Sequence, residues 1–219
     1  MEHDDARSTL AGLRHGAPAG FTTIMADPPW RFANRTGKVA PEHRRLQRYP
    51  TLSTPEIAAL PVAGLASRAA HLYLWVPNAV LADGLAVMAA WGFRYTTNLV
   101  WYKTRRDGGP DGRGVGFYFR NVTELLLFGV CGRLRTLPAG RSQVNLLASP
   151  KREHSRKPDE CYDLIEACSP GPYLELFARF PRDGWTQWGN EIAPLVQTEV
   201  SAASEMTAGS SCAATDQGS

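Results

Sequence analysis

Short apolar runs alternate with amphipathic segments through the middle of the chain. Runs of apolar, β-branched and aromatic residues are typical of strands that are buried on both faces. Such runs predict strands over residues 21–26, 71–76, 93–102, 121–130, 173–178 and 185–188. The intervening pattern predicts helices over residues 54–60, 79–90 and 158–168. Alternating strands and helices predict an α/β fold, with one sheet covered by helices on both faces.

Capping residues support the predicted ends of two helices. Thr54 and Pro55 fit an N-cap and a first helical position. Asn78 can cap the next helix, and Gly92 stands where a C-cap glycine belongs. The two helices are therefore expected close to these bounds.

The remaining segments predict one domain with two tails. Residues 104–116 contain five glycines and one proline, which predicts a flexible loop. Residues 1–19 and 194–219 lack periodicity and are predicted to be disordered. The folded domain is therefore expected to span residues 20–193.

Composition narrows the class of protein only slightly. A length of 219 residues with 43% hydrophobic content suits one domain with a real core. The net charge of +3 is weak evidence for a nucleic-acid partner. The four cysteines form no pattern of metal ligands, so we expect a reduced, cytoplasmic protein without a metal site. No signal peptide or bilayer-spanning run is visible, so no membrane partner is expected.

The tetrapeptide Asp27-Pro28-Pro29-Trp30 directly follows the first predicted strand. Two prolines remove two N–H donors and leave carbonyl groups available as acceptors. The Asp27 carboxylate and the Pro28 carbonyl could bind the two N–H groups of an aromatic amine such as adenine N6. The nitrogen lone pair would then face an electrophile, while Trp30 stacks on the base. For the tetrapeptide alone, a proline-rich turn with an incidental acid is an equal alternative.

Two later segments also carry groups suited to a ligand. A basic stretch that includes His154, Ser155 and Lys157 precedes a predicted helix start, where it could bind phosphate or carboxylate. A solvated basic loop is the alternative. The strand over residues 173–178 leads into Arg179, and Asn190-Glu191 could bind ribose hydroxyls. No GxGxxG pattern follows any strand, so a standard dinucleotide fingerprint is absent.

Taken in order, these segments resemble the MT-A70 family of S-adenosylmethionine-dependent N6-adenine methyltransferases, in particular its bacterial or phage-type members. The blocks at residues 73–76, 91–93 and 101–104 resemble the interior of that family, and the resemblance covers roughly residues 21–192. It implies a Rossmann-like class I methyltransferase sheet with permuted motif order, in which the catalytic motif precedes the cofactor strand. The implied cofactor is S-adenosyl-L-methionine.

The resemblance also assigns site residues. The catalytic residues would be Asp27, Pro28, Pro29 and Trp30. The cofactor would be bound by Asp27, Phe177, Arg179, Asn190, Glu191, Ser155 and Lys157.

Basic residues gather in two predicted loops around this site. They are Arg31, Arg35, Lys38, Arg44, Arg45, Arg48, Lys103, Arg105 and Arg106. A positive rim fits binding of a phosphate backbone with a flipped or single-stranded base. We therefore expect methyl transfer to adenine N6 in nucleic acid. DNA is favoured, because a compact chain without RNA-binding modules resembles the bacterial or phage branch.

Other functions remain open at this stage. The chain could be an RNA N6-adenosine methyltransferase or a non-catalytic nucleic-acid-binding subunit of the same fold. Methylation of a small-molecule or protein amine is a further alternative, although it leaves the basic loops without a role. Dimer formation also stays open.

Overall fold

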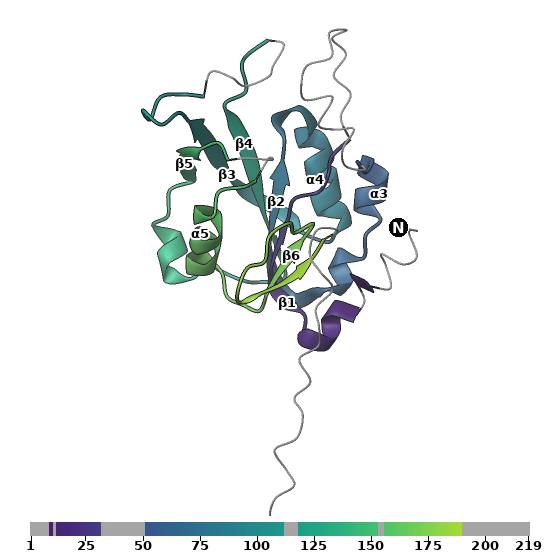
Figure 1. Ribbon diagram of the computed structural model, residues 1–219. Coiled ribbons are helices and arrows are strands. Elements are labelled where there is room, and N and C mark those ends of the chain that lie inside the picture. The colour runs from purple at the N-terminus through teal and green to yellow at the C-terminus, as the bar shows by residue number, and fades with distance from the viewer. Residues whose placement is uncertain (1–8, 11, 32–50, 112–117, 153–155, 190–219) are drawn as a thin grey trace, which may run out of the picture.

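The computed structural model describes residues 9–10, 12–31, 51–111, 118–152 and 156–189, and the structural statements below concern these residues. They form one mixed sheet with helices on both faces (Figure 1). The strands are β1 (Phe21–Ala26), β2 (Ala66–Val76), β3 (Arg94–Thr104), β4 (Thr123–Cys131), β5 (Leu146–Pro150), β6 (Tyr173–Leu176) and β7 (Trp185–Trp188). The α-helices are α3 (Thr54–Ala58), α4 (Leu81–Ala90) and α5 (Glu160–Cys168). The 3-10 helices are η1 (Leu13–Gly16), η2 (Val62–Gly64), η3 (Asn78–Val80) and η4 (Pro138–Arg141).

The sheet order is β5-β3-β4-β2-β1-β6-β7. Strand β1 runs parallel to β2 and to β6, and the outer pairs β3–β5 and β6–β7 are parallel as well. Strand β4 is antiparallel to both of its neighbours, β2 and β3. The carboxyl ends of β1, β2, β3 and β6 therefore meet the start of β4 at one edge of the sheet. We call this edge, uppermost in Figure 1, the carboxyl edge.

This topology confirms the predicted Rossmann-like α/β class. Strand β1, which precedes Asp27, comes before β6 in the chain and pairs with it in the sheet. The predicted permutation depends on which strand binds the cofactor, and it stays a prediction.

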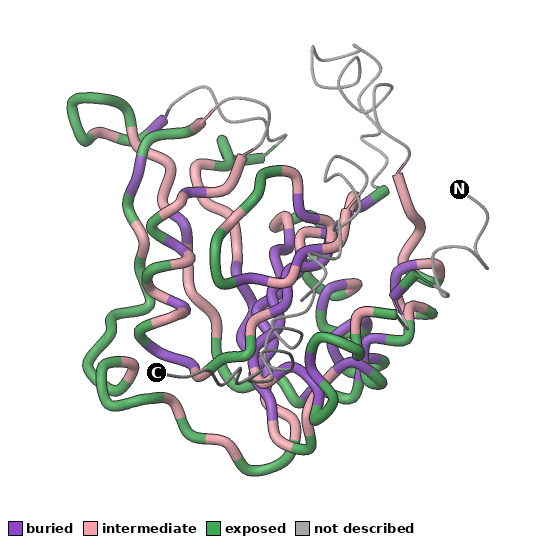
Figure 2. The backbone as a smooth tube through the Cα atoms, turned by 60° about the horizontal axis from the view of Figure 1, so that its bottom comes forward, coloured by how far each residue is buried: buried purple, intermediate pink, exposed green. Residues whose placement is uncertain are grey.

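The central strands bury both of their faces. On β2, Leu72, Leu74 and Val76 pack in the cluster that includes Val87 and Met88 of α4. The alternate residues, Tyr73 and Trp75, pack in the cluster that includes Ile165 of α5. Figure 2 shows buried residues concentrated along these inner strands. Burial on both faces explains why the sequence there is a continuous apolar run rather than an alternating one.

Some predicted helix ends differ from the observed ones. Ser53, not Thr54, is the N-cap of α3, and its N–H and hydroxyl donate to the Glu56 carboxylate at 2.6 Å. Asn78 does not cap α4, because its amide donates to Thr123 at the start of β4. Gly92 follows α4 with a φ of +82°, the left-handed conformation that the C-cap prediction requires.

The edges of the domain also differ from the predictions. Strand β5 was not predicted, because Ala-Ser-Pro has low strand propensity and the strand pairs only with β3. The predicted N-terminal tail is wrong from residue 9 onward, since Leu10 is fully buried and η1 follows it. Residues 1–8 and 190–219 lie outside the described residues. None of the described helices combines the length and hydrophobicity that a membrane span requires.

Candidate active site

A cavity of about 260 Å³ opens at the carboxyl edge, between the end of β1, the end of β6 and the segment before α5. Its lining includes Asp27, Trp75, Lys157, Glu175, Phe177 and Arg179. Four of these were predicted site residues, and they come from parts of the chain that are far apart in sequence. Sheets of this class bind ligands at the same position.

Asp27 and Lys157 form the central contact of the cavity. The Lys157 ammonium donates to both carboxylate oxygens of Asp27, each at 2.9 Å. The Asp27 N–H donates to the Leu176 carbonyl at 3.3 Å, which ties the turn after β1 to the end of β6. The structure thus joins the predicted catalytic acid directly to a predicted cofactor-binding lysine.

This contact belongs to a chain of four charges that we call the ion ladder: Asp27, Lys157, Glu124 and Lys103. Glu124 lies 3.0 Å from the Lys157 ammonium and 2.8 Å from the Lys103 ammonium. The four side chains are only 13–19% exposed, and their formal charges cancel. Burial alone raises the pKa of Glu124, but the two ammonium groups outweigh burial and lower that pKa to about 2. The carboxylates of Asp27 and Glu124 raise the pKa of Lys157, although burial by itself lowers it.

The Pro-Pro-Trp part of the tetrapeptide is more tightly bonded than predicted. The Pro28 carbonyl accepts the Trp30 N–H at 2.8 Å, and the Pro29 carbonyl accepts the Leu52 N–H at 2.9 Å. Each carbonyl therefore already has one partner, although a second lone pair remains for a ligand. The Trp30 ring is 4% exposed, and its N–H donates to the Trp75 carbonyl at 2.9 Å. The prediction that Trp30 offers a face for base stacking is wrong for this structure, because the ring is part of the core.

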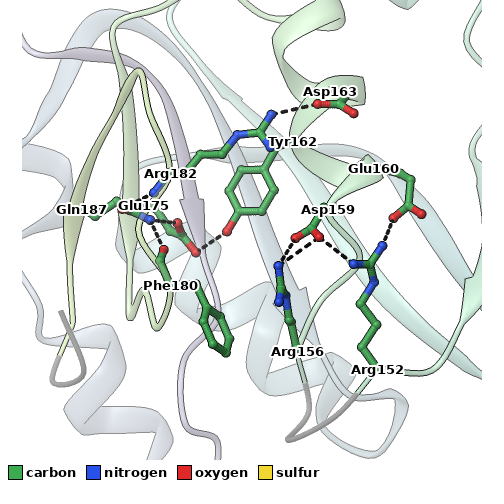
Figure 3. Close-up of polar contacts among 10 residues, drawn as sticks. All are labelled: Arg152, Arg156, Asp159, Glu160, Tyr162, Asp163, Glu175, Phe180, Arg182 and Gln187. Carbon is green, nitrogen blue, oxygen red and sulfur yellow. Dashed lines mark hydrogen bonds and ion pairs between the residues drawn. The ribbon is translucent and has the colours of Figure 1, made fainter.

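A second acid, Glu175 on β6, lies in the cavity wall with neutral partners. Tyr162 donates its hydroxyl to this carboxylate at 2.8 Å, and the Gln187 amide donates at 2.6 Å (Figure 3). Burial raises the pKa of Glu175 to about 7, and these two hydrogen bonds oppose the rise only in part. We call Glu175, Tyr162 and Gln187 the Glu175 cluster.

The segment after β6 adopts an unusual backbone conformation. Phe177 has a φ of +65°, a region that non-glycine residues occupy at a cost of about 1–3 kcal/mol. The chain then returns to β7, where Ala178 donates to the Trp188 carbonyl at 3.0 Å. Gly189 permits this approach, since a Cβ there would lie 2.0 Å from the Ala178 oxygen. The turn brings Phe177 and Arg179 to the cavity and ends β6 two residues earlier than predicted.

Ion pairs fix the other wall of the cavity. Arg152 and Arg156 both donate to Asp159 just before α5, and Arg182 donates to Asp163 at 2.8 Å (Figure 3). The Arg156 guanidinium also lies 4.7 Å from the centre of the Phe180 ring. Asp159 is thus held by two arginines.

The indole N–H of Trp75 is a donor without a partner. It is buried, and no hydrogen-bond acceptor among the described residues reaches it. Trp75 is one of the residues that line the cavity, and a buried donor without an acceptor is rare in folded proteins. The cavity also contains two acids together with Lys157 and Arg179, so it suits a polar ligand that carries both signs of charge.

The predicted basic rim is only partly described. Arg31, Arg105 and Arg106 are exposed; Arg31 donates to Thr51, and Arg105 pairs with Asp107. Lys103 was expected on this rim, but it is largely buried in the ion ladder, so it is a poor phosphate contact. The other predicted residues lie outside the described residues: Arg35, Lys38, Arg44, Arg45, Arg48, Ser155, Asn190 and Glu191.

Sequence reasoning missed several residues of the cavity and of the network around it. They are Glu124, Trp75, Tyr162, Glu175 and Gln187. An acid inside an otherwise apolar strand was the available signal for Glu175. Glu124 at the start of a strand gave no such signal, because only the sheet order brings it to Lys157.

Comparison with known proteins gives consistent matches. The family model described as MT-A70 matches residues 21–191. An MT-A70-like protein of Medicago truncatula is 32% identical over 178 residues, which cover 79% of this chain and 26% of that protein. The catalytic subunit METTL3 of human N(6)-adenosine-methyltransferase is 31% identical over 180 residues, which cover 78% of this chain and 28% of METTL3. The type II methyltransferase M.MunI of a Mycoplasma species is 29% identical over 188 residues, which cover 78% of each chain.

Proposed function

The chain belongs to the MT-A70 family, and from this premise we propose that it transfers a methyl group from S-adenosylmethionine to N6 of adenine in nucleic acid, with DNA favoured. One observation carries the proposal. Asp27-Pro28 stands at the carboxyl edge beside a cavity that also holds Lys157, Glu175 and an orphaned Trp75 N–H. The alternation of strands and helices alone would not have suggested this chemistry.

The residues of the cavity fit the methionine part of S-adenosylmethionine. This cofactor, when bound, supplies a methyl group activated by a positively charged sulfur. Lys157 and Arg179 are cations that suit its carboxylate, and the Trp75 N–H offers another donor. Asp27 and Glu175 are acids that suit its ammonium group. The cavity thus contains groups complementary to both the carboxylate and the ammonium group of the methionine part.

Asp27 and the Pro28 carbonyl are the acceptors for the substrate amine. Held by both, the amine would present its lone pair to the methyl group, and such positioning supplies a large part of the rate. Lys157 donates to both Asp27 oxygens, and each oxygen keeps a second lone pair that can accept an amine N–H. Glu124, 3.0 Å from the same ammonium, helps to hold Lys157 in this position. Asp27 is also placed to accept the proton that the nitrogen loses after transfer.

The preference for DNA rests on the extent of the matches along each chain. The match covers 78% of M.MunI but about a quarter of the N(6)-adenosine-methyltransferase relatives. The adenosine-methyltransferase names of the other relatives keep RNA as the second candidate substrate.

Incubation with a labelled methyl donor and matched DNA, RNA or free adenosine tests the proposal. We expect label in DNA adenine, and label in RNA alone would instead support the second candidate. Absence of label from every adenine would reject the proposal. Calorimetry with S-adenosylmethionine then separates a non-catalytic subunit from an enzyme tested on the wrong substrate, since the former should bind the cofactor weakly.

A further inference from the structure

Tyr118 and Phe119 form an exposed aromatic pair in the loop between β3 and β4. They are 87% and 86% exposed, whereas the other exposed large hydrophobic residues range from 36% to 67%. A single exposed apolar side chain is ordinary, but two adjacent aromatic rings in water favour a binding partner. We call them the aromatic pair.

The loop that bears the aromatic pair begins at the ion ladder. The Lys103 N–H donates to the Val122 carbonyl at 2.8 Å and closes the base of the loop, while the side chains of Lys103 and Glu124 pair across it. Five residue steps separate Phe119 from Glu124, which limits their separation to about 17 Å. Figure 1 shows the described ends of this loop at the carboxyl edge, and Asp27 follows the end of β1 at the same edge. The aromatic pair is thus within a few nucleotide lengths of the cavity.

The exposed charged residues in the described parts of this loop are mainly positive. Arg120 follows the pair directly and is exposed, as is Arg106 on the other arm of the loop. Arg105 is also exposed, but its positive charge is offset by an ion pair with Asp107. Aromatic faces interleaved with basic side chains suit a nucleic-acid strand, since bases stack on the rings and phosphates attract the cations. A protein partner would need acidic groups to complement the same arginines.

We propose that Tyr118 and Phe119 stack on bases next to the target adenine, while Arg106 and Arg120 contact the adjoining phosphates. An enzyme that methylates a base inside the cavity must take that base out of its stack. The neighbouring bases then lose a stacking partner, and an inserted or apposed aromatic ring replaces it. This inference rests on the proposed function and names the residues that hold the substrate strand.

The test compares binding of a fluorescein-labelled single-stranded DNA, and of a duplex with the same sequence, by the full chain and its variants. Tyr118→Ala with Phe119→Ala should weaken binding at least tenfold at fixed salt. Tyr118→Phe with Phe119→Tyr should stay within threefold of the unchanged protein, because both rings remain. Tyr95→Ala is the matched control, since Tyr95 is 43% exposed and stands at the opposite edge of the sheet. Arg120→Ala should reduce the salt dependence of binding.

Further measurements on the same variants separate the possible outcomes. Unchanged S-adenosylmethionine affinity in the double alanine variant shows that the cavity is intact. Binding within twofold of the unchanged protein overturns the inference, while methyl transfer by the unchanged protein would still support the proposed function. A change from dimer to monomer in the variant, with DNA affinity retained, would instead assign the pair to a contact between copies. An unchanged protein that binds neither DNA nor RNA would overturn both proposals.

Discussion

The ion ladder and the Glu175 cluster place two buried acids near the same cavity in opposite electrostatic states. Glu124 has two lysine partners, which lower its pKa to about 2. Glu175 has a tyrosine hydroxyl and a glutamine amide as partners, and its pKa rises to about 7. Burial raises the pKa of both acids, but the two lysine charges lower that of Glu124, whereas the Asp27 charge adds to the rise at Glu175. Glu124 therefore stays ionised at neutral pH, whereas Glu175 can gain or lose a proton there.

The largest expected effect comes from Asp27, the end of the ladder that lines the cavity. Asp27→Asn keeps the shape of the side chain but removes the charge and one acceptor. We expect methyl transfer to fall by about a thousandfold or more, in line with loss of one preorganised polar group at a reacting centre. The labelled-methyl assay measures the loss, and a native circular dichroism spectrum at the assay temperature would show that the fold is retained. Activity within a few-fold of the unchanged protein would contradict the role given to Asp27.

The next effect concerns stability. Glu124→Gln removes the negative charge between two largely buried lysines, and breaking a buried ion pair costs about 4 kcal/mol. Urea unfolding measures the change in the free energy of unfolding. Asp107→Asn is the matched control, because Asp107 and Arg105 are 63% and 56% exposed and such pairs contribute below about 1 kcal/mol. Equal losses in the two variants would show that burial of the ladder has no energetic consequence.

The pH dependence of stability should distinguish the Glu175 cluster from the ladder. The pKa of Glu175 is raised in the folded state, so its contribution is fully present below its unfolded value of about 4.5 and is lost as pH rises through about 7. The loss amounts to about 3 kcal/mol over that interval. Glu175→Gln should remove this decline, measured as unfolding free energy at several pH values.

His71 titrates with the opposite effect on stability. Because His71 is present in both the unchanged protein and Glu175→Gln, its effect cancels when their pH profiles are compared. Burial lowers the pKa of His71, so His71 destabilises the fold as pH falls below about 6.5. Parallel pH profiles for the unchanged protein and Glu175→Gln would contradict the raised pKa of Glu175.

The smallest effect tests one neutral partner. Tyr162→Phe removes one hydrogen bond to Glu175 and should cost about 1 kcal/mol, again measured in urea. The lost bond should also raise the pKa of Glu175 further. Tyr95→Phe removes an exposed hydroxyl that donates to Asn98, and this control should change stability by only a few tenths of a kcal/mol. A Tyr162→Phe loss as large as that for Glu124→Gln would erase the distinction between neutral and charged partners.

The sequence predicted the fold class, and four of its candidate site residues line the same cavity. Apolar runs identified the inner strands because their burial on two faces leaves a continuous signal, whereas the short edge strand β5 left none. The turn at Asp27 was predicted because its residues are adjacent in the chain. Lys157 was assigned to the cofactor only through the family resemblance, and the structure bonds it to Asp27 across 130 positions.

Contacts that depend on the sheet order could not be predicted. Glu124 reaches Lys157 only because β4 is reversed between β2 and β3. The burial of Trp30 depends on Leu52 and Trp75, which approach it after the chain has folded. Propensity and spacing describe neighbours along the chain, whereas these contacts join residues that are distant in sequence.

The antiparallel orientation of β4 also affects which insertions the fold can tolerate during evolution. Because β3 and β4 are neighbouring antiparallel strands, the segment joining them is a hairpin loop whose two ends are already held together. Lengthening a loop of this kind adds little entropic cost, about 0.6 kcal/mol for each doubling. Insertions there leave every strand of the sheet and the four ladder charges in place. Under the role proposed for the aromatic pair, such insertions would change contacts with the substrate strand while the ladder residues keep their positions.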